Sequence, residues 1–530
     1  ELRRLVEPLL VAPGPSSVWG RASLIGVASA VLGLLPYHYA LRELPGGLAA
    51  VLFSSTPLFT LPLCLLIGQR VGLFSVLGTG LGFAGVAAIL LGSGTPEEPQ
   101  PVGLLVEPVP LASPVSARYP VFVEGERFAT GVLAGTPDGL ESGPAARSLP
   151  SAVMTARAAG GGDGNGAFRL VLLGDSDPSS SSERTVTMES GSGAAPLRRY
   201  FVNWADVPRA ARLSSGALLA ATLERLGDST YAYGVRLTLE EDGPPGRDLG
   251  WLHDDEQPVE HGFVSLLPLP TGGALGVWLD DRAGGTGVGH GSGAGMQLLG
   301  RTIDAGGTRS PEVLLDHRVC DCCPTDAVAL PDGSAVVVYR DRSEDETRDI
   351  WTVRRAADGG WSEPRPVYQD GWRTEACPVN GPAIAADGSM VAVAWYTEAG
   401  VAGEPRVLVA FSRDAGATYS RPIEVDSEGP LGRVDIGAVG AGAFVVSYLG
   451  APAGGKAPWT ARVVTPGRAP GTGVLIAQVD AARRSGRLSL AASPGGILHA
   501  IWTAQDGVEA ARLRVVTQAP ATDAGPNPQR

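Results

Sequence analysis

Apolar and polar positions follow two different patterns along the chain. In the first hundred residues, three apolar runs cover residues 22–41, 46–68 and 71–92, and none of them contains Asp, Glu, Lys or Arg. Each run is about 20 residues long, which is the length of a helix that crosses a bilayer. The pattern therefore predicts a membrane segment with three transmembrane helices over residues 1–93.

The arginines around these runs predict the orientation of the segment. Arg3, Arg4 and Arg21 precede the first run and Arg70 lies between the second and third, whereas Arg42 alone lies in the other turn. Positively charged residues favour the cytoplasmic side of a membrane. Three crossings then place everything after residue 93 outside. We expect a bacterial inner-membrane protein whose larger part lies in the periplasm or exterior.

From about residue 200 the long runs stop and short alternating strands begin. A turn of small residues or Asp-Gly is followed by an apolar strand that ends in an aromatic residue, and this unit recurs at intervals of 56, 61, 56, 53 and 54 residues. A repeat of this length with about four strands is typical of a β-propeller. The aromatic slot is occupied in turn by Thr222, Trp278, Tyr339, Trp395, Tyr448 and Trp502.

These repeats predict an all-β propeller of six blades over residues 113–520. Residues 113–198 contain further strand-like stretches diluted by runs rich in Gly and Ser, so a degenerate seventh blade is left open there. Residues 94–112 are rich in Pro and acidic residues and are predicted to be a linker. Residues 521–530 are predicted to be a disordered tail.

Composition narrows the class of partner. The chain has 73 Gly and 43 Pro among its 530 residues, which agrees with an all-β fold that has many tight turns. Its net charge of −13 argues against nucleic acid as a partner. The expected partners are the membrane, through residues 22–92, and a ligand of the propeller.

Two stretches resemble known families. The segments "PGGLAAVLFSSTPLF" and "LGFAGV" resemble three consecutive helices of the EamA-type drug/metabolite transporters, over about residues 20–93. Members of that family have many more helices, so three cannot form a transport pathway alone. The segment "FSRDAGATYS", residues 411–420, resembles the Asp box of sialidase-like (BNR-repeat) propellers. That resemblance covers about residues 200–520, and it implies that Asp414 braces a turn while Tyr419 packs beneath it.

Propeller geometry places the unusual side chains on one face. The loops after the aromatic strands and the crossovers between blades lie on that face and are dense in Arg, Asp, Glu and aromatic residues. The resemblance to sialidases implies an arginine clamp for a substrate carboxylate, a Tyr nucleophile with a Glu, and an Asp acid/base. The candidates are Arg282, Arg340, Arg373 and Arg433 for the clamp, Tyr396 with Glu375 for the nucleophile pair, and Asp281 or Asp206 for the acid.

Glu260 and His261 are further candidates for substrate binding. His261 fits a proton shuttle or ligand, and it equally fits a buried histidine hydrogen-bonded within a crossover. The sequence thus predicts a membrane-tethered, outward-facing propeller that binds an acidic glycan or other small anionic ligand, or hydrolyses a glycan as an exo-glycosidase. Two alternatives are a non-catalytic binding or scaffold propeller, and a gene-model fusion of a transporter fragment to an unrelated propeller.

Four of the five cysteines are predicted to converge. Cys323 and Cys377 each precede a proline and lie nine or ten residues before an Asp-Gly turn, so they occupy equivalent positions in consecutive blades. We expect these two to lie close enough to bridge, with Cys320 and Cys322 beside them. Outside the cytoplasm disulfides are the default, and the pairing stays open. A metal bound by all four thiolates is the alternative, and no other cofactor is expected.

Overall fold

The computed structural model divides into two units, residues 1–100 and 101–530. It describes residues 102–109, 118–122, 151–158, 166–173 and 186–187, and then 201–517 except 202, 242–245, 285–294, 401, 494 and 506. The predicted membrane segment and the predicted tail therefore lie outside the described residues. Among the residues that are described, no helix has the length and apolar character needed to span a membrane.

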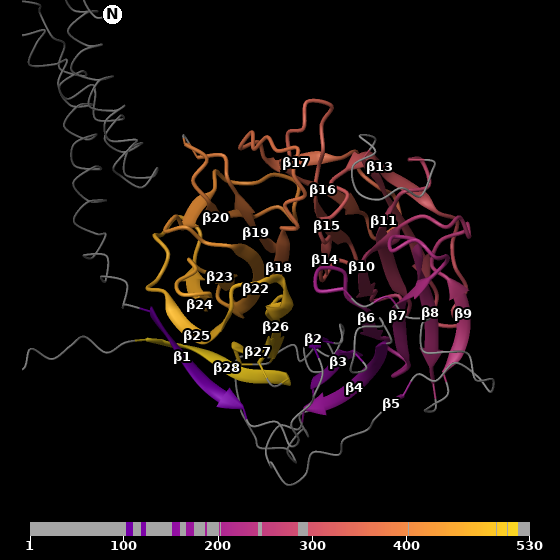
Figure 1. The fold of residues 1–530 in the computed structure, drawn as a ribbon, viewed down its shortest axis with the longest axis horizontal. Coiled ribbons are helices and arrows are strands. Elements are labelled where there is room, and N and C mark those ends of the chain that lie inside the picture. Colours follow the sequence, from indigo (N-terminus) through magenta and orange to yellow (C-terminus); the bar gives the residue numbers. More distant parts are fainter. Residues whose placement is uncertain are drawn as a thin grey trace, which may run out of the picture. The chain divides into compact units, whose positions relative to one another are not determined.

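The described strands form seven four-stranded antiparallel sheets, which Figure 1 shows arranged around a central axis. Sequence predicted six blades and left a seventh open within residues 113–198, and the seventh sheet is found there. The first four sheets in chain order are β2 (Arg118–Phe122), β3 (Ser151–Ala158), β4 (Gly166–Leu173) and β5 (Val186–Thr187); β6 (Arg209–Arg212), β7 (Leu218–Arg225), β8 (Tyr233–Glu240) and β9 (Arg247–Trp251); β10 (His261–Pro268), β11 (Ala274–Asp280), β12 (Met296–Ile303) and β13 (Val313–Val319); and β14 (Asp326–Ala329), β15 (Ala335–Arg340), β16 (Ile350–Arg355) and β17 (Arg365–Tyr368).

The last three sheets complete the ring. They are β18 (Ala383–Asp387), β19 (Met390–Thr397), β20 (Arg406–Ser412) and β21 (Ile423–Asp426); β22 (Gly432–Gly440), β23 (Ala443–Leu449), β24 (Lys456–Val464) and β25 (Val474–Asp480); and β26 (Ser489–Ser493), β27 (Ile497–Ala504) and β28 (Gly507–Thr517) with β1 (Val102–Val109). A single turn of 3-10 helix, η4 (Arg483–Ser485), precedes β26.

The last sheet is closed by a strand from the opposite end of the propeller sequence. β1 pairs with β28 in an unbroken antiparallel register from Val102↔Thr517 to Val109↔Ala510. The sequence predicts a linker over residues 94–112, and this prediction is wrong for Val102–Val109, which form β1. Buried and exposed side chains alternate along this strand: Leu104 and Val106 pack against the core of the last blades, while Leu105 is 43% exposed. The Pro and Glu residues around it make this alternation hard to see in the sequence.

The aromatic slot of the repeat ties neighbouring blades together. Trp278, Tyr339, Trp395 and Tyr448 are almost completely buried in the second strands of their sheets. The Tyr339 hydroxyl donates to Asp316 of the preceding blade at 2.6 Å, and the Tyr448 hydroxyl likewise donates to Asp426 at 2.8 Å. A buried aromatic thus fills the space between sheets, and a carboxylate satisfies its polar atom, from the preceding blade for the two tyrosines and from Asp280 of the same strand for Trp278.

Carboxylates of the innermost strands make a second set of ties. Asp326 in β14 accepts from the Ile384 amide of β18 at 2.9 Å, and Asp435 in β22 accepts from the Leu490 amide of β26 at 2.7 Å. Inner strands of adjacent blades do not pair with each other, so their amide groups need such acceptors. These bonds fix the spacing of the blades around the axis.

The closing strand gives a direct test of the fold. Val106→Asp places a charge against the apolar core of the last sheet and should lower the free energy of unfolding by about 1–3 kcal/mol. Leu105→Asp changes the adjacent, exposed position and should shift it by less than about 0.5 kcal/mol. Chemical unfolding of the detergent-solubilised full chain, followed by near-UV circular dichroism, measures both. Equal effects of the two variants would contradict the register of β1.

Candidate functional site

The crossover face of the propeller is built on irregular backbone at the starts of the inner strands. Phe263, Val379 and Arg433 have positive φ angles of 51°, 50° and 53°, and each lies at or just before the start of an inner strand. The ladder registers of β10 and β22 shift at these points. Such bulges occur where a strand has to re-aim a side chain. The same irregularity in three blades indicates a feature of the repeat.

Polar contacts between blades hold this irregular rim in place. The Thr325 hydroxyl donates to the Phe263 carbonyl at 2.9 Å, and the Arg433 amide donates to Asn380 Oδ1 at 2.7 Å. Trp204, from the segment before β6, lies against the guanidinium of Arg433, whose Cζ is 4.8 Å from the ring centroid. Because these residues belong to different blades, Trp204 reaches across the crossover end of the channel.

A buried phenol and two carboxylates form the most unusual polar group on this face. The Tyr233 hydroxyl lies 2.7 Å from Asp206 Oδ2 and 2.7 Å from Glu260 Oε1. Tyr233, Asp206 and Glu260 are 1%, 2% and 5% exposed. Gly262 makes room for them, because a Cβ at that position would overlap both Asp206 and the Tyr233 ring. The three side chains come from the starts of β8 and β10 and from the segment before β6.

The number of protons available shows that one carboxyl of this group is protonated. A phenol has one proton, so it can donate to only one of the two carboxylates, and a second short contact requires a protonated carboxyl. Burial raises the pKa of Asp206 to about 6, although a bond from the Phe263 amide lowers it in part. Burial also raises the pKa of Glu260 well above its usual value, and Asp206 and Asp281 add to that effect. The group therefore keeps a shared proton at mildly acidic pH.

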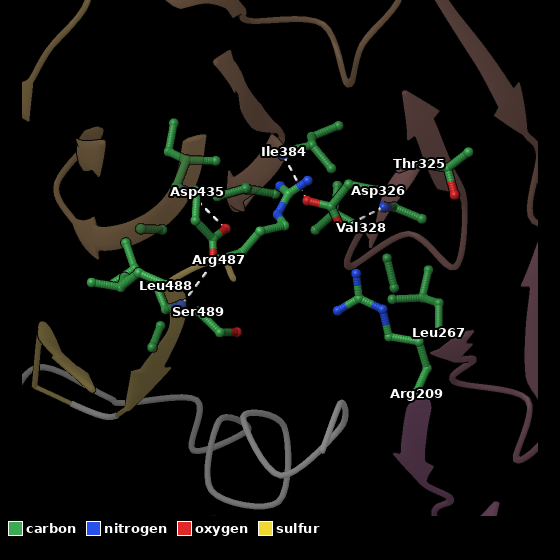
Figure 2. Close-up of a pocket in the computed structure, with 18 of the residues that line it drawn as sticks. Arg209, Leu267, Thr325, Asp326, Val328, Ile384, Asp435, Arg487, Leu488 and Ser489 are labelled. Atoms are coloured by element: carbon green, nitrogen blue, oxygen red, sulfur yellow. Dashed lines mark hydrogen bonds between the residues drawn. The ribbon is translucent and has the colours of Figure 1, made fainter. Parts of the chain in front are cut away.

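The central cavity lies along the innermost strands (Figure 2). It measures about 220 Å³ and extends from the crossover ends of these strands, near Arg209 and Asp435, to their far ends near Pro331 and Gly388. Figure 2 shows the guanidinium groups of Arg209 and Arg487 directed into this space from two sides.

Arg487 is the more constrained of the two arginines. Its Nη2 donates to the Val434 carbonyl at 2.9 Å, while its Nη1 is buried and has no hydrogen-bond partner among the described residues. Burial lowers the pKa of Arg487, and the nearby Asp435 opposes that effect. A buried N–H group without a partner is costly. Arg487 therefore brings a cationic side chain to the cavity wall, with one buried N–H group that no described residue satisfies.

The four arginines predicted to form a clamp are each engaged elsewhere. Arg340 is buried and donates to three backbone carbonyls, those of Asn380, Arg348 and Tyr396. Arg433 donates to Ser485 Oγ at 2.7 Å.

The other two arginines lie nearer the surface. Arg282 pairs with Asp280 at 2.6 Å and with Glu312 at 2.7 Å. Arg373 is exposed and donates to the Asp345 carbonyl at 3.0 Å. The residues that line the central cavity include Arg209 and Arg487 and none of these four.

The remaining predicted residues are also located. The Tyr396 hydroxyl donates to Glu398 at 2.5 Å, and burial with this contact raises the pKa of Tyr396, whereas Glu375 is exposed. Asp281 is half-buried, and burial followed by the charge of Asp321 raises its pKa.

His261 is buried, stacked on His253 with ring centroids 3.8 Å apart, and its Nε2 lies 2.7 Å from Asp255. Burial followed by the charge of His261 lowers the pKa of His253 to about 3. The crossover position therefore holds a buried histidine pair beside an acid.

The four cysteines converge as predicted, and the structure selects one of the pairings that the sequence left open. Cys322 bridges to Cys377, and Cys320 and Cys323 are buried thiols whose sulfurs are 2.8 Å apart. The pairing that the sequence left open is therefore Cys322 with Cys377, while Cys323 lies against Cys320. With two sulfurs bridged, a site with four thiolates is not present in this state. The atoms of His253, Asp255 and His261 also lie within the reach of a single metal ion.

Sequence reasoning missed Arg209, Arg487 and Tyr233. A signal for the first existed, because Arg209, Asp326 and Asp435 each precede by seven residues the glycine of the following turn, Gly216, Gly333 or Gly442. They occupy one register position of the inner strand, which faces the axis. The predicted site residues lie mostly in loops, where charged residues are frequent.

The turn at residues 412–419 has the geometry that its sequence implied. Asp414 accepts from the Thr418 amide at 2.9 Å and from the Thr418 hydroxyl at 2.6 Å, and these bonds, led by the hydroxyl, lower the pKa of Asp414 to about 2. Tyr419 packs against the core beneath it. The turn connects β20 and β21, on the face opposite the crossovers, and acts as a brace.

Comparison with known proteins bears on both parts of the chain. Residues 6–91 match the EamA-like transporter family. No curated protein matches the chain.

Solved structures similar to this chain include a lectin from Burkholderia pseudomallei (12% identity, 69% of this chain and 93% of that chain, TM-score 0.45). They also include a Hadza microbial sialidase (15%, 66% and 73%, 0.40) and the polysaccharide lyase Uly1 (10%, 79% and 99%, 0.41). The resemblance to EamA transporters expected from the sequence is confirmed over residues 6–91.

The shared proton predicts an unusual pH dependence of stability. Because the pKa of Asp206 is raised to about 6 in the fold, the native state holds this proton more tightly than the unfolded chain. The resulting stabilisation is complete below about pH 4 and is lost as the pH rises through about 6. Asp206→Asn can donate to Tyr233 at every pH. Between pH 4.5 and 7.5 it should gain roughly 1–3 kcal/mol of unfolding free energy relative to the wild type.

Urea unfolding at both pH values measures this difference. Asp304→Asn is the control, because hydrogen bonds led by the Thr308 amide lower the pKa of Asp304 at an exposed turn. Asp304→Asn should show no such gain. A pH-independent difference between Asp206→Asn and the wild type would argue against the shared proton.

Proposed function

We propose that the propeller binds an acidic sugar, or a similar small carboxylate, in its central cavity. The observation that carries this proposal is the pair of guanidinium groups, Arg209 and Arg487, that project into a cavity of about 220 Å³, one of them with a buried unpaired Nη1. A guanidinium offers a fork of N–H groups that matches a carboxylate. The resemblance of residues 200–520 to sialidase-like propellers supports a carbohydrate as the carrier of that carboxylate.

The cavity suits one end of a glycan better than a long oligosaccharide. Sites for larger ligands usually exceed about 300 Å³, and this one is smaller. Apolar side chains such as Leu267, Ile384 and Ile436 form much of its wall, and such walls strengthen the interaction between an arginine and an anion by excluding water. We therefore infer that one terminal acidic residue is recognised.

Hydrolysis is the second candidate function, and the Tyr233 group is the observation that favours it. A phenol between two carboxylates is the set of groups that a tyrosine-dependent glycosidase needs. In this structure the three side chains are at most 5% exposed, so a substrate would reach them only after the face opened. Binding without turnover is the function that this arrangement supports best.

We also propose that residues 22–92 tether the propeller to the membrane with the propeller outside. The match of residues 6–91 to a transporter family and the distribution of arginines support the tether. The Cys322–Cys377 bridge supports an oxidising compartment for the propeller. The alternative of a fused gene model would be decided by sequencing the transcript.

Loss of either cavity arginine should weaken ligand binding. Arg209→Gln or Arg487→Leu removes a charge-assisted hydrogen bond worth about 1.5–3 kcal/mol, so the Kd for N-acetylneuraminic or glucuronic acid should rise at least about tenfold. Calorimetric titration of the full chain measures this change. Neutral galactose should bind much more weakly to the wild type.

Arg373→Ala is the matched control, because Arg373 is an exposed arginine outside the cavity. Its Kd should equal that of the wild type. An aryl sialoside assay accompanies the titration. Turnover that Tyr233→Phe abolishes would replace the binding proposal with hydrolysis. Unchanged affinity in both cavity variants would exclude the cavity as the binding site.

Membrane orientation is tested with reporter fusions. Alkaline phosphatase, which is active only outside the cytoplasm, should be active when fused after residue 100, and a fluorescent reporter that matures only inside should be dark. A second fusion moves the excess of positive charge to the other side: Arg3, Arg4 and Arg21 are changed to Ser, and arginines are added at residues 43–45. This change should reduce phosphatase activity severalfold. Cytoplasmic activity of the unmodified fusion would overturn the proposed topology.

A further inference from the structure

The four cysteines of the crossover face hold one bridged and one reduced pair in contact. The Cys322–Cys377 bridge joins the crossovers before β14 and β18. Cys320 belongs to the reduced pair and also approaches the bridge. Its sulfur is 2.8 Å from that of Cys323 and 3.9 Å from that of Cys322. A thiolate that is this close to a disulfide sulfur can attack it. The arrangement therefore offers a continuous path for disulfide exchange.

A buried cation lies beside the sulfur in the middle of this path. The Arg348 side chain is 1% exposed, and its Nε and Nη1 have no hydrogen-bond partner within the described part of the chain. Burial opposes ionisation of Cys320, but the hydrogen bond from Cys323 and the charge of Arg348 outweigh it, so the pKa of Cys320 is lowered. Burial and the neighbouring Cys320 raise the pKa of Cys323. Cys320 is thus the thiol that ionises first.

The other end of the path reaches solvent. Cys377 is exposed, whereas Cys320, Cys322 and Cys323 are each at most 2% exposed. A carboxylate oxygen of Asp321 lies within 4.8 Å of the sulfurs of both Cys322 and Cys377. It is placed to exchange a proton with either sulfur when their bond breaks. An external sulfur compound can therefore meet the cluster only at Cys377.

We propose that this cluster is a thiol–disulfide exchange centre that reduces an external disulfide through Cys377, with Cys320 and Cys323 as the electron source. The Cys320 thiolate attacks Cys322 Sγ and displaces Cys377 as a thiolate. Cys323, deprotonated, then attacks Cys320 Sγ, which forms the Cys320–Cys323 bond and releases Cys322. These steps move two electrons and two protons from Cys320 and Cys323 to Cys322 and Cys377, and the protein as a whole is neither oxidised nor reduced.

The external step completes the balance. Cys377 attacks the substrate disulfide, one substrate thiol leaves, and Cys322 resolves the mixed disulfide and releases the second. Two electrons and two protons have then moved from Cys320 and Cys323 to the substrate, and the protein holds two bridges. An external dithiol restores the starting state by the reverse steps. The substrate class is a disulfide that is small or exposed enough to reach Cys377.

The test uses the full chain, isolated anaerobically in detergent, with oxidised glutathione as the probe. The wild type should release two equivalents of glutathione thiol, and mass spectrometry after acid quenching and alkylation should find a new Cys320–Cys323 bridge. Cys320→Ser and Cys377→Ser should each slow release more than about tenfold, since one lacks the internal nucleophile and the other the surface sulfur. Cys64→Ser, outside the cluster, should behave as the wild type.

Several outcomes would overturn the proposal. Release by Cys377→Ser at the wild-type rate would show that another sulfur meets the substrate. A bridge that persists at Cys322–Cys377 without any Cys320–Cys323 product would show that the two pairs do not communicate. Stoichiometric zinc or copper in the isolated chain, lost in Cys320→Ser, would establish a metal site instead. Near-UV circular dichroism of each variant separates loss of exchange from loss of folding.

Discussion

Closure of the ring is the constraint on which the rest of the molecule depends. Seven sheets surround the axis, and the last is joined to the first part of the propeller sequence because β1 pairs with β28 over eight residues. Without β1, the β28 strand would present an unpaired edge, which proteins avoid because it invites aggregation. The inner strands would also lose the fixed spacing that their side-chain bonds require. The cavity and the crossover face both exist because the ring is closed.

Within the closed ring, one register position has been used in two ways. Asp326 and Asp435 occupy the position that faces the axis and give their oxygens to amides of the next blade. Arg209 occupies the same position in its own blade, where its Nε donates to the Val264 carbonyl of the next blade at 3.3 Å and its guanidinium also extends into the cavity. A repeat therefore supplies acceptors at this position in some blades and a cationic donor in another. Divergence at an axial position changes the cavity without disturbing the sheets.

The outcome shows which parts of a sequence carry information about this fold. The aromatic slot could be predicted from the sequence because an aromatic residue recurs in blade after blade. β1 could not be predicted, because it is one short strand with Pro and Glu around it and no repeat provides a comparison. The equivalence of Cys323 and Cys377 located the cluster correctly, yet pairing depends on which way each side chain turns, and that is a matter of local backbone. The predicted arginine clamp does not line the cavity, for a physical reason. Crossover backbone has no strand partners, so Arg340 and Arg433 donate to its carbonyls.

Several arginines in the described part of the chain have a buried guanidinium nitrogen without a hydrogen-bond partner, and two of them, Arg487 and Arg348, lie where negative charge could be stabilised. Arg487 has an Nη1 without a hydrogen-bond partner, and Arg348, although ion-paired with Glu346 and Asp321, has an Nε and Nη1 without one. A buried cation without full compensation is costly, and a fold keeps one only when the rest of the structure holds it there. An anion that arrives beside either group recovers part of that cost. In the cavity the anion would be a ligand carboxylate, and beside the cysteines it would be a thiolate made by the protein itself. The same physical device thus supports recognition at the axis and sulfur chemistry at the rim.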